Sequence, residues 1–276
     1  MTPRKIIIAG NWKMNLNVQQ SSLLLQHLQE HIKIQRLVEV VLAPSLLALQ
    51  PLSLQLDRRR FRLAAQNAFY KDEGAYTGEV SFAMLRELVH YVIVGHSERR
   101  FYFHETPEVV RDKVAAAVRN GITPILCIGE TKREHEAHET KQVLHDQLTT
   151  AISNLTSEEI ESIVIAYEPV WAISSGRDFA HHEVARPDEV ARAARFIRHD
   201  IAELYGQIAA DKVRVIYGGS SNAENAYAYL STEGIDGLLP GGASLQYMEF
   251  AGMVSAAERV QQAKIKELSK TNGRTT

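Results

Sequence analysis

The chain has 276 residues, of which 45% are hydrophobic and 23% are charged, and its formal net charge at pH 7 is -2. This is the composition of a globular protein, and the small net charge provides no basic field to attract nucleic acid or anionic lipid. A single cysteine, Cys127, excludes an intrachain disulfide. The N-terminal apolar run is too short for a signal peptide and no run has membrane-spanning length, so we expect a cytoplasmic protein without membrane or nucleic-acid partners.

Short β-branched segments recur along the chain, and each is followed by a longer stretch with helical spacing. Residues 21–32 and 187–206 are two such helical stretches. This alternation predicts βα units built around a parallel sheet. The predicted strands are, in chain order, residues 5–11, 38–44, 61–67, 90–96, 122–129, 162–169, 212–219 and 235–242.

The arrangement of these units is predicted to be a single-domain α/β barrel. No linker rich in proline, glycine or serine interrupts residues 1–276, so we expect one domain with a short frayed C-terminal tail. Eight βα units close naturally into a (β/α)8 barrel, although a doubly wound open sheet would explain the same alternation. Polar side chains favour the barrel because they follow the carboxyl ends of several strands, which a barrel gathers into one ring. These side chains are Asn11, Lys13, Gln66, Asn67, His96 and Glu168.

Asn11, Lys13, His96 and Glu168 are therefore the candidate catalytic residues. Each alone is more often structural, since a lysine after a strand is usually a solvated charge and an isolated histidine is usually a hydrogen-bonded core group. Their shared placement indicates a site that acts on an anionic or carbonyl-bearing substrate. Glu168 ends an apolar strand and precedes Pro169, so partial desolvation would make it a better proton acceptor, with a buried ion pair as the alternative.

Two glycine turns follow the last two predicted strands, YGGSS at 217–221 and PGGAS at 240–244. Each precedes a helical pattern, so backbone N–H groups can face an anion without an intervening side chain. One such turn is weak evidence, but two at corresponding positions after the seventh and eighth strands indicate a phosphate site.

Three histidines, His135, His138 and His145, lie in a charge-rich stretch that is predicted to be one helix. They lack HExxH spacing and a supporting cysteine cluster, so a solvated helix face is favoured over a metal site. The sequence contains neither a dinucleotide-binding GxGxxG motif nor a P-loop. We therefore expect no metal and no organic cofactor.

Several motifs in fixed order resemble those of the triosephosphate isomerase family. They are GNWKMN (10–15), AQN (65–67), GAYTGE (74–79), GHSERR (95–100), CIGE (127–130), AYEPVWAI (166–173), YGGS (217–220) and GGASL (241–245). The resemblance spans nearly the whole chain. It implies a TIM barrel that interconverts dihydroxyacetone phosphate and D-glyceraldehyde 3-phosphate, in glycolysis and gluconeogenesis, without a cofactor.

The resemblance also implies roles for the candidate residues. In this family a carboxylate acts as the base and a neutral histidine acts as the electrophile. Glu168 would move a proton between adjacent carbons, while a neutral His96 would polarise the carbonyl group. His96 also opens a short predicted helix, whose N-terminal dipole disfavours the imidazolium. Lys13 and Asn11 would stabilise the developing enediolate, and Glu98 would hold Lys13.

The remaining implied residues bind phosphate, close a lid or contact a second subunit. The lid would be the loop at about residues 169–187, which would exclude water from the reacting substrate. A homodimer is the implied assembly. The implied residues are Ser174, Ser220, Gly241 and Gly242 for phosphate, Tyr217, Ser220 and Gly176 for the lid latch, and Thr77 and Met14 for the dimer contact.

The lid is also where the chain departs from the family pattern. The family usually has AIGTGK and soon reaches its next proline, whereas this chain has AISSGRDFAHHEVARP, about six residues longer. Ser174 replaces a glycine and Arg177 replaces a lysine, while His181 and His182 in the added segment have no assigned role. Pro240 stands where a small apolar residue is usual. Two alternatives therefore stay open: an isomerase of a longer ketose phosphate, such as a tetrulose phosphate, and a catalytically weak phosphate-binding module.

Overall fold

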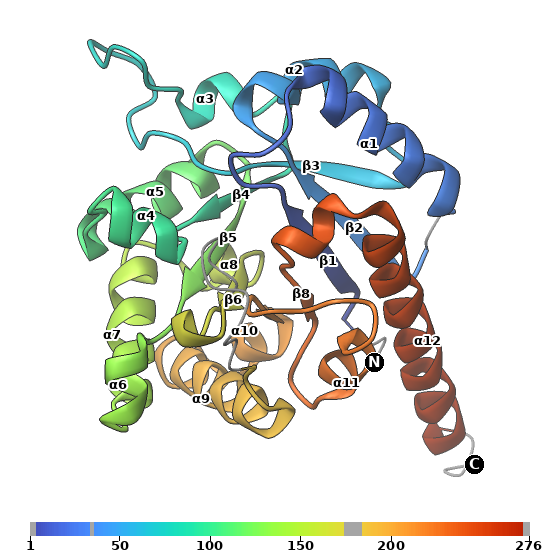
Figure 1. Ribbon diagram of the computed structural model, residues 1–276. Helices are drawn as coiled ribbons and strands as arrows, with labels where there is room; N and C mark the ends of the chain where they lie inside the picture. The colour runs from blue at the N-terminus through green and yellow to red at the C-terminus, as the bar shows by residue number, and fades with distance from the viewer. Residues whose placement is uncertain (1–3, 34–35, 174–183, 273–276) are drawn as a thin grey trace.

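A computed structural model describes residues 4–33, 36–173 and 184–272 of the chain (Figure 1). The described strands form a closed barrel in the order β1 to β8, and each neighbouring pair is parallel. The predicted barrel is confirmed, and the open doubly wound sheet is excluded. The strands are β1 (Ile6–Asn11), β2 (Val38–Ala43), β3 (Phe61–Ala65), β4 (Tyr91–Val94), β5 (Thr123–Ile128), β6 (Val164–Tyr167), β7 (Arg214–Tyr217) and β8 (Gly237–Leu238).

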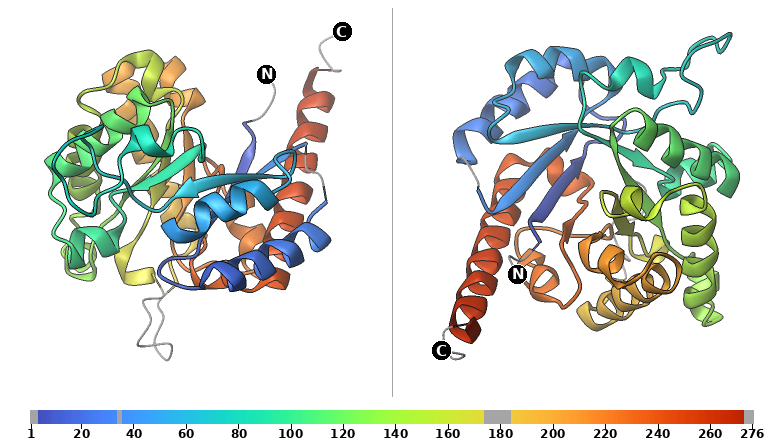
Figure 2. Two further views of the ribbon diagram at one scale, coloured as in Figure 1. Left: turned by 90° about the horizontal axis from the view of Figure 1, so that it is seen from above. Right: turned by 180° about the vertical axis from the view of Figure 1, so that it is seen from behind.

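Helices surround the barrel on its outside (Figures 1 and 2). The last of them, α12, lies along β1 and β2 and extends past the end of the barrel. No helix in the described part of the chain is long and apolar enough to cross a membrane. The described helices are α1 (Val18–His31), α2 (Leu46–Gln55), α3 (Phe82–Leu85), α4 (Ser97–Tyr102), α5 (Pro107–Arg119), α6 (Lys132–Glu136), α7 (Thr140–Ile152), α8 (Ser157–Ile160), α9 (Pro187–Tyr205), α10 (Gln207–Lys212), α11 (Ala226–Ser231) and α12 (Tyr247–Asn272), with 3-10 turns η1 (Val170–Ala172) and η2 (Gly242–Leu245).

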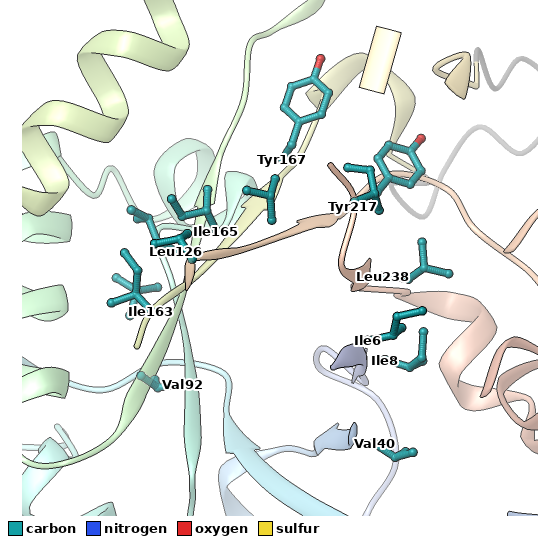
Figure 3. Close-up of a cluster of buried hydrophobic side chains, with 14 of the residues drawn as sticks. Ile6, Ile8, Val40, Val92, Leu126, Ile163, Ile165, Tyr167, Tyr217 and Leu238 are labelled. Atoms are coloured by element: carbon teal, nitrogen blue, oxygen red, sulfur yellow. The ribbon is translucent and has the colours of Figure 1, made fainter. Parts of the chain in front are cut away.

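Alternate residues of the strands supply two separate apolar cores. Ile7 and Ala9 of β1 belong to a cluster made of strand residues and Leu239, which follows β8, and this cluster fills the barrel interior. Ile6 and Ile8 belong to the larger cluster, which includes helix residues and so lies between the barrel and the helices (Figure 3). This follows from the two-residue period of a strand, which sends neighbouring side chains to opposite faces. The filled interior makes the barrel a rigid support for the residues beyond its strand ends.

Most strands end before the predicted boundary, and this shift matters for the site. His96 and Glu168 were predicted to end strands, but each lies in the turn that follows its strand. His96 caps the N-terminus of α4, as expected for the start of a short helix. The candidate residues are therefore held by turns whose geometry the barrel fixes at one end.

The charge-rich stretch with three histidines forms two helices, so the prediction of one helix is wrong. His138 separates α6 from α7 and has a φ of 60°, a left-handed conformation that ends the first helix. His145 Nδ1 lies 3.0 Å from Asp200 Oδ2, and His135 Nδ1 lies 3.3 Å from Glu130 Oε1. Among the residues that the structure describes, no group of three His, Cys, Asp or Glu side chains could hold a metal ion.

Candidate active site

His96 lies at the N-terminus of α4 with its ring buried and in contact with Glu168. The Glu98 backbone N–H donates to His96 Nδ1 over 3.2 Å. A nitrogen that accepts a hydrogen bond carries no proton, so the ring is neutral with its proton on Nε2. His96 Nε2 lies 3.1 Å from Glu168 Oε1, and the two side chains are 8% and 3% exposed. The ring can therefore act as a neutral hydrogen-bond donor inside the barrel mouth.

Glu168 is a buried carboxylate whose second oxygen accepts a hydrogen bond from the Ser97 backbone N–H over 3.1 Å. Glycines pack closely on both sides of it. A Cβ on Gly218 would lie 2.6 Å from Glu168 Cγ, and a Cβ on Gly129 would lie 1.8 Å from the Glu168 carbonyl oxygen. Any other residue at position 218 would displace the Glu168 side chain, and any other residue at position 129 would displace the Glu168 backbone. The sequence reasoning missed Ser97 and Gly129, although the motifs GHSERR and CIGE contain them.

Lys13 has a strained backbone that its neighbours hold in place. Its φ is 53°, which is uncommon for a non-glycine residue and requires support from the surrounding structure. The Lys13 N–H donates to Asn11 Oδ1 over 3.0 Å, and Gln66 Nε2 donates to the Lys13 carbonyl over 2.8 Å. Lys13 Nζ lies 2.7 Å from Glu98 Oε1. The ammonium group is thereby fixed at the same mouth as His96.

Asn67 belongs to a different network from the one expected. It follows β3 beside Gln66, but its side-chain oxygen accepts from Lys113 Nζ over 2.6 Å. Lys113 is buried and also pairs with Glu105. Asn67 therefore supports the packing of α5 rather than the catalytic cluster.

Arg100 joins the two loops that carry the site. Its Nε donates to the Gly95 carbonyl over 2.7 Å, and its Nη2 donates to the Cys127 carbonyl over 3.1 Å. Gly95 has a φ of 70°, and a Cβ there would lie 2.8 Å from the guanidinium. The arginine thus fixes the turn before His96 to the end of β5. Its role in the GHSERR motif is positional.

A cavity of about 300 Å³ unites Asn11, Lys13 and His96 with both glycine turns. Within the described residues, the N–H groups of Gly241 and Gly242 donate to no protein acceptor. The Ser220 N–H is engaged, because it donates to the Ala172 carbonyl over 3.0 Å. The N–H groups of Gly241 and Gly242 can therefore donate to an anion directly. Ser220 would first have to release Ala172. Glu168 borders an adjacent cavity of about 450 Å³.

Several lid residues lie outside the described part of the chain, namely Ser174, Gly176, Arg177, His181 and His182. The described residues at the start of the lid meet a buried carboxylate, Glu130, which the sequence reasoning missed. Trp171 Nε1 donates to Glu130 Oε1 over 2.8 Å, and the Tyr167 hydroxyl donates to the same oxygen over 3.1 Å. The His135 ring packs against Trp171 in a tilted arrangement, with ring centroids 4.3 Å apart. The end of β6 and the first turn of the lid are thereby fixed together.

Tyr217, an expected lid latch, is buried and stacks on Tyr229 with ring centroids 4.3 Å apart. Burial raises the pKa of the Tyr217 hydroxyl, so it stays protonated. This hydroxyl has no hydrogen-bond partner among the described residues. A buried hydrogen-bond donor without a partner is rare in folded proteins, so we expect another group to pair with the Tyr217 hydroxyl.

The two expected dimer contacts, Thr77 and Met14, are exposed. Thr77 lies in a loop between β3 and α3 that projects from the barrel (Figure 1). The Met14 side chain is 97% exposed, which is unusual for a large apolar residue. Met14 and Phe103 border a cavity of about 510 Å³ that also reaches Lys13 and Glu98.

Comparisons with known proteins agree with this geometry. The family model for triosephosphate isomerase matches residues 6–257. A triosephosphate isomerase from Citrifermentans bemidjiense is 44% identical over 256 residues, which are 92% of this chain and 100% of that protein. One from Dehalococcoides mccartyi is 42% identical over 258 residues, 94% of this chain and 98% of that protein.

A third relative, a triosephosphate isomerase from Ligilactobacillus salivarius, is 42% identical over 243 residues, 88% of this chain and 94% of that protein. All three relatives carry the same name, so neither the longer ketose phosphate nor the weak phosphate-binding module gains support. With the closed barrel, the motifs and these matches in agreement, the chain belongs to the triosephosphate isomerase family.

Proposed function

We propose that the chain interconverts dihydroxyacetone phosphate and D-glyceraldehyde 3-phosphate by proton transfer through an enediolate. The main support is the contact between a buried carboxylate and a neutral imidazole, Glu168 and His96, which lie 3.1 Å apart. His96 shares a cavity with two glycine N–H groups that donate to no acceptor among the described residues. A proton acceptor, a neutral donor and an anion site are the three parts that this reaction requires.

Glu168 would act as the base. Its carboxylate would take the proton from the carbon next to the carbonyl group and return it to the adjacent carbon. Between the two steps the substrate is an enediolate and the carboxylate is protonated. The hydrogen bond from Ser97 N–H holds Glu168 beside the adjacent cavity, so this bond must break before the carboxylate reaches the substrate. The narrow gap beside Gly218 sets the path of the movement.

His96, Lys13 and Asn11 would stabilise the negative charge that develops on the substrate oxygens. The Nε2–H of His96 would donate to the carbonyl oxygen and move a proton between the two oxygens. The Lys13 ammonium would act as a fixed positive charge, held by Glu98 at 2.7 Å. Such preorganised groups lower the barrier because they need no rearrangement when the charge forms.

Gly241 and Gly242 would hold the phosphate group through their N–H groups, with Ser220 and Ser174 as further donors. Because Ser220 N–H donates to Ala172, phosphate binding would be coupled to movement of the lid segment after Glu168. The hydroxyl of Tyr217 would then find its partner in the closed lid, with Gly176 as the other latch position. Closure would exclude water from the enediolate.

A coupled assay with D-glyceraldehyde 3-phosphate tests the proposal. Wild-type protein should turn over the substrate, and Glu168→Gln, which keeps the shape and removes the base, should lower kcat by about a thousandfold or more. A matched change on an exposed helix surface, Glu203→Gln, should leave kcat unchanged. A folded wild-type protein without turnover would overturn the assignment.

We propose that the functional unit is a cytoplasmic homodimer in which the Thr77 loop of one copy enters the 510 Å³ cavity of the other. The exposed Met14 and Phe103 and the projecting loop support this assembly. In it, the loop would cover Lys13 and Glu98. Thr77→Arg should produce monomers in analytical ultracentrifugation and lower kcat, whereas Thr149→Arg on α7 should not. A wild-type monomer with full activity would contradict the dimer.

A further inference from the structure

A second polar cavity, of about 410 Å³, opens at the end of the barrel opposite the candidate active site. Its wall includes Glu39 near the start of β2, Tyr91 at the start of β4 and Thr123 at the start of β5. The N-terminal ends of barrel strands ordinarily serve stability rather than catalysis. A cavity of this volume is nevertheless within the range of small-molecule sites, which makes its charges informative.

The floor of this cavity is electrically neutralised. The Arg214 guanidinium lies 2.7 Å from Glu39 Oε2 and donates to the Tyr91 hydroxyl over 2.9 Å. Burial alone would raise the pKa of Glu39, but the ion pair with Arg214 outweighs it and lowers the pKa. Burial raises the pKa of Tyr91 to about 12, so its hydroxyl stays protonated. The Glu39 carboxylate is therefore already engaged in an ion pair with Arg214.

Two arginines, Arg58 and Arg86, and a second carboxylate, Glu87, also border the cavity. Arg58 is exposed and has no carboxylate within ion-pair distance among the described residues. Arg86 lies 3.6 Å from its chain neighbour Glu87, but both side chains are largely exposed, so this pair contributes little. Arg62 donates to the backbone carbonyls of Arg58 and Phe61, not to a carboxylate. The guanidinium groups keep most of their hydrogen-bonding capacity.

His90 lies in the wall of the cavity together with Arg58 and Arg86. Burial lowers the pKa of His90, and the positive charges of Arg62 and Arg58 lower it further, while Glu39 is the one acid that opposes them. The Arg62 guanidinium reaches the Arg58 backbone carbonyl, so the two arginines lie at the same end of the barrel, where like charges repel. An anion in the cavity would relieve that repulsion.

We propose that this cavity binds a small anion that carries one or two phosphate groups. Arginine forks match phosphate oxygens and bind them in pairs, and Arg58 and Arg86 border the cavity together with His90. A cavity of about 410 Å³ suits a small molecule better than a nucleic-acid strand, which needs an extended basic surface that a chain of net charge -2 lacks. The site is separate from the catalytic cavity and shares no wall residue with it.

A titration of the His90 imidazole signal by NMR tests the proposal, with inorganic phosphate and pyrophosphate as probes in separate arms. Both anions can also enter the catalytic cavity, but His90 borders the other one, so its signal is specific. We expect a saturable shift of the His90 signal and a rise in its pKa, because the anion offsets Arg58 and Arg62. Pyrophosphate should bind more tightly than phosphate if two phosphate groups are accommodated.

Arg58→Gln with Arg86→Gln should weaken pyrophosphate binding by about tenfold or more, since each change removes a charge-assisted hydrogen bond. Arg59→Gln is the matched control, because Arg59 is 77% exposed, pairs with Asp57 and does not line the cavity. It should leave binding unchanged, and all variants should keep wild-type kcat and KM. Both replaced arginines are exposed, so the fold should persist. A His90 signal that does not saturate, or an equal loss with Arg59→Gln, would overturn the proposal.

Discussion

Shortening the proposed base by one methylene group should reduce turnover far more than substrate affinity. In Glu168→Asp the charge is kept, but the main chain cannot advance to compensate. The Glu168 N–H donates to the Ile128 carbonyl over 2.8 Å, and the Glu168 carbonyl lies against Gly129, where even a Cβ would be 1.8 Å away. The carboxylate therefore withdraws by about 1.5 Å, one carbon–carbon bond.

A misplacement on the order of 1 Å can cost about a hundredfold in rate, which corresponds to about 2.7 kcal/mol in the barrier. We expect kcat of Glu168→Asp to fall by about that factor. KM should change much less, because the N–H groups of Gly241 and Gly242 are untouched. The coupled assay with D-glyceraldehyde 3-phosphate measures both constants. Glu203→Asp, the same change on an exposed part of α9, is the control. A kcat within about threefold of wild type would mean that Glu168 is not the base.

Three further outcomes are expected. Gly218→Ala would place a Cβ 2.6 Å from Glu168 Cγ, so kcat should fall while the circular dichroism spectrum stays native; unchanged kcat would show that the carboxylate can yield. Tyr217→Phe removes a buried hydroxyl without a partner among the described residues, so the Tm should not fall, while KM should rise if the hydroxyl latches the lid. Burial raises the pKa of Glu105, but hydrogen bonds and ion pairs with Lys113 and Arg99 outweigh it and hold the pKa below its ordinary value of 4.5. A carboxyl group whose pKa is lower in the folded protein than in the unfolded chain stabilises the fold at pH values above its unfolded-state pKa. This stability is lost as the pH falls through the folded-state pKa. Thermal denaturation between roughly pH 3 and pH 6 should therefore show a loss below about pH 4.5 that Glu105→Gln reduces; equal acid sensitivity in both proteins would argue against this ion pair.

The fold could be predicted because its strands are β-branched segments with clear helical stretches between them. The ends of the strands could not be predicted, because they depend on where each turn begins at the barrel mouth. His96 lies two residues after the end of β4 and Glu168 lies one residue after the end of β6, whereas both were predicted to lie inside strands. The break between α6 and α7 was missed as well, since the left-handed φ of His138 leaves no trace in a pattern of charges.

The candidate site was predicted from residue types that donate or accept protons, and the structure brings Asn11, Lys13 and His96 together. The sequence could not indicate which glycines lie in close contact with the Glu168 backbone or side chain. Gly129 looks like an ordinary turn residue until its distance to Glu168 is known. Glu130 likewise resembles a surface carboxylate, although it is fully buried and accepts from two aromatic side chains.

The barrel closes through its shortest described strand, and this affects how the chain can fold during synthesis. Ile7 and Ile8 of β1 pair with Gly237 and Leu238, the whole of β8. One edge of β1 therefore has no partner strand until β8 leaves the ribosome, more than two hundred residues later. The helix α12, which packs against β1, is synthesised after that. Until then the apolar edge of β1 stays open to aggregation or to a chaperone, because contacts so distant in sequence form late.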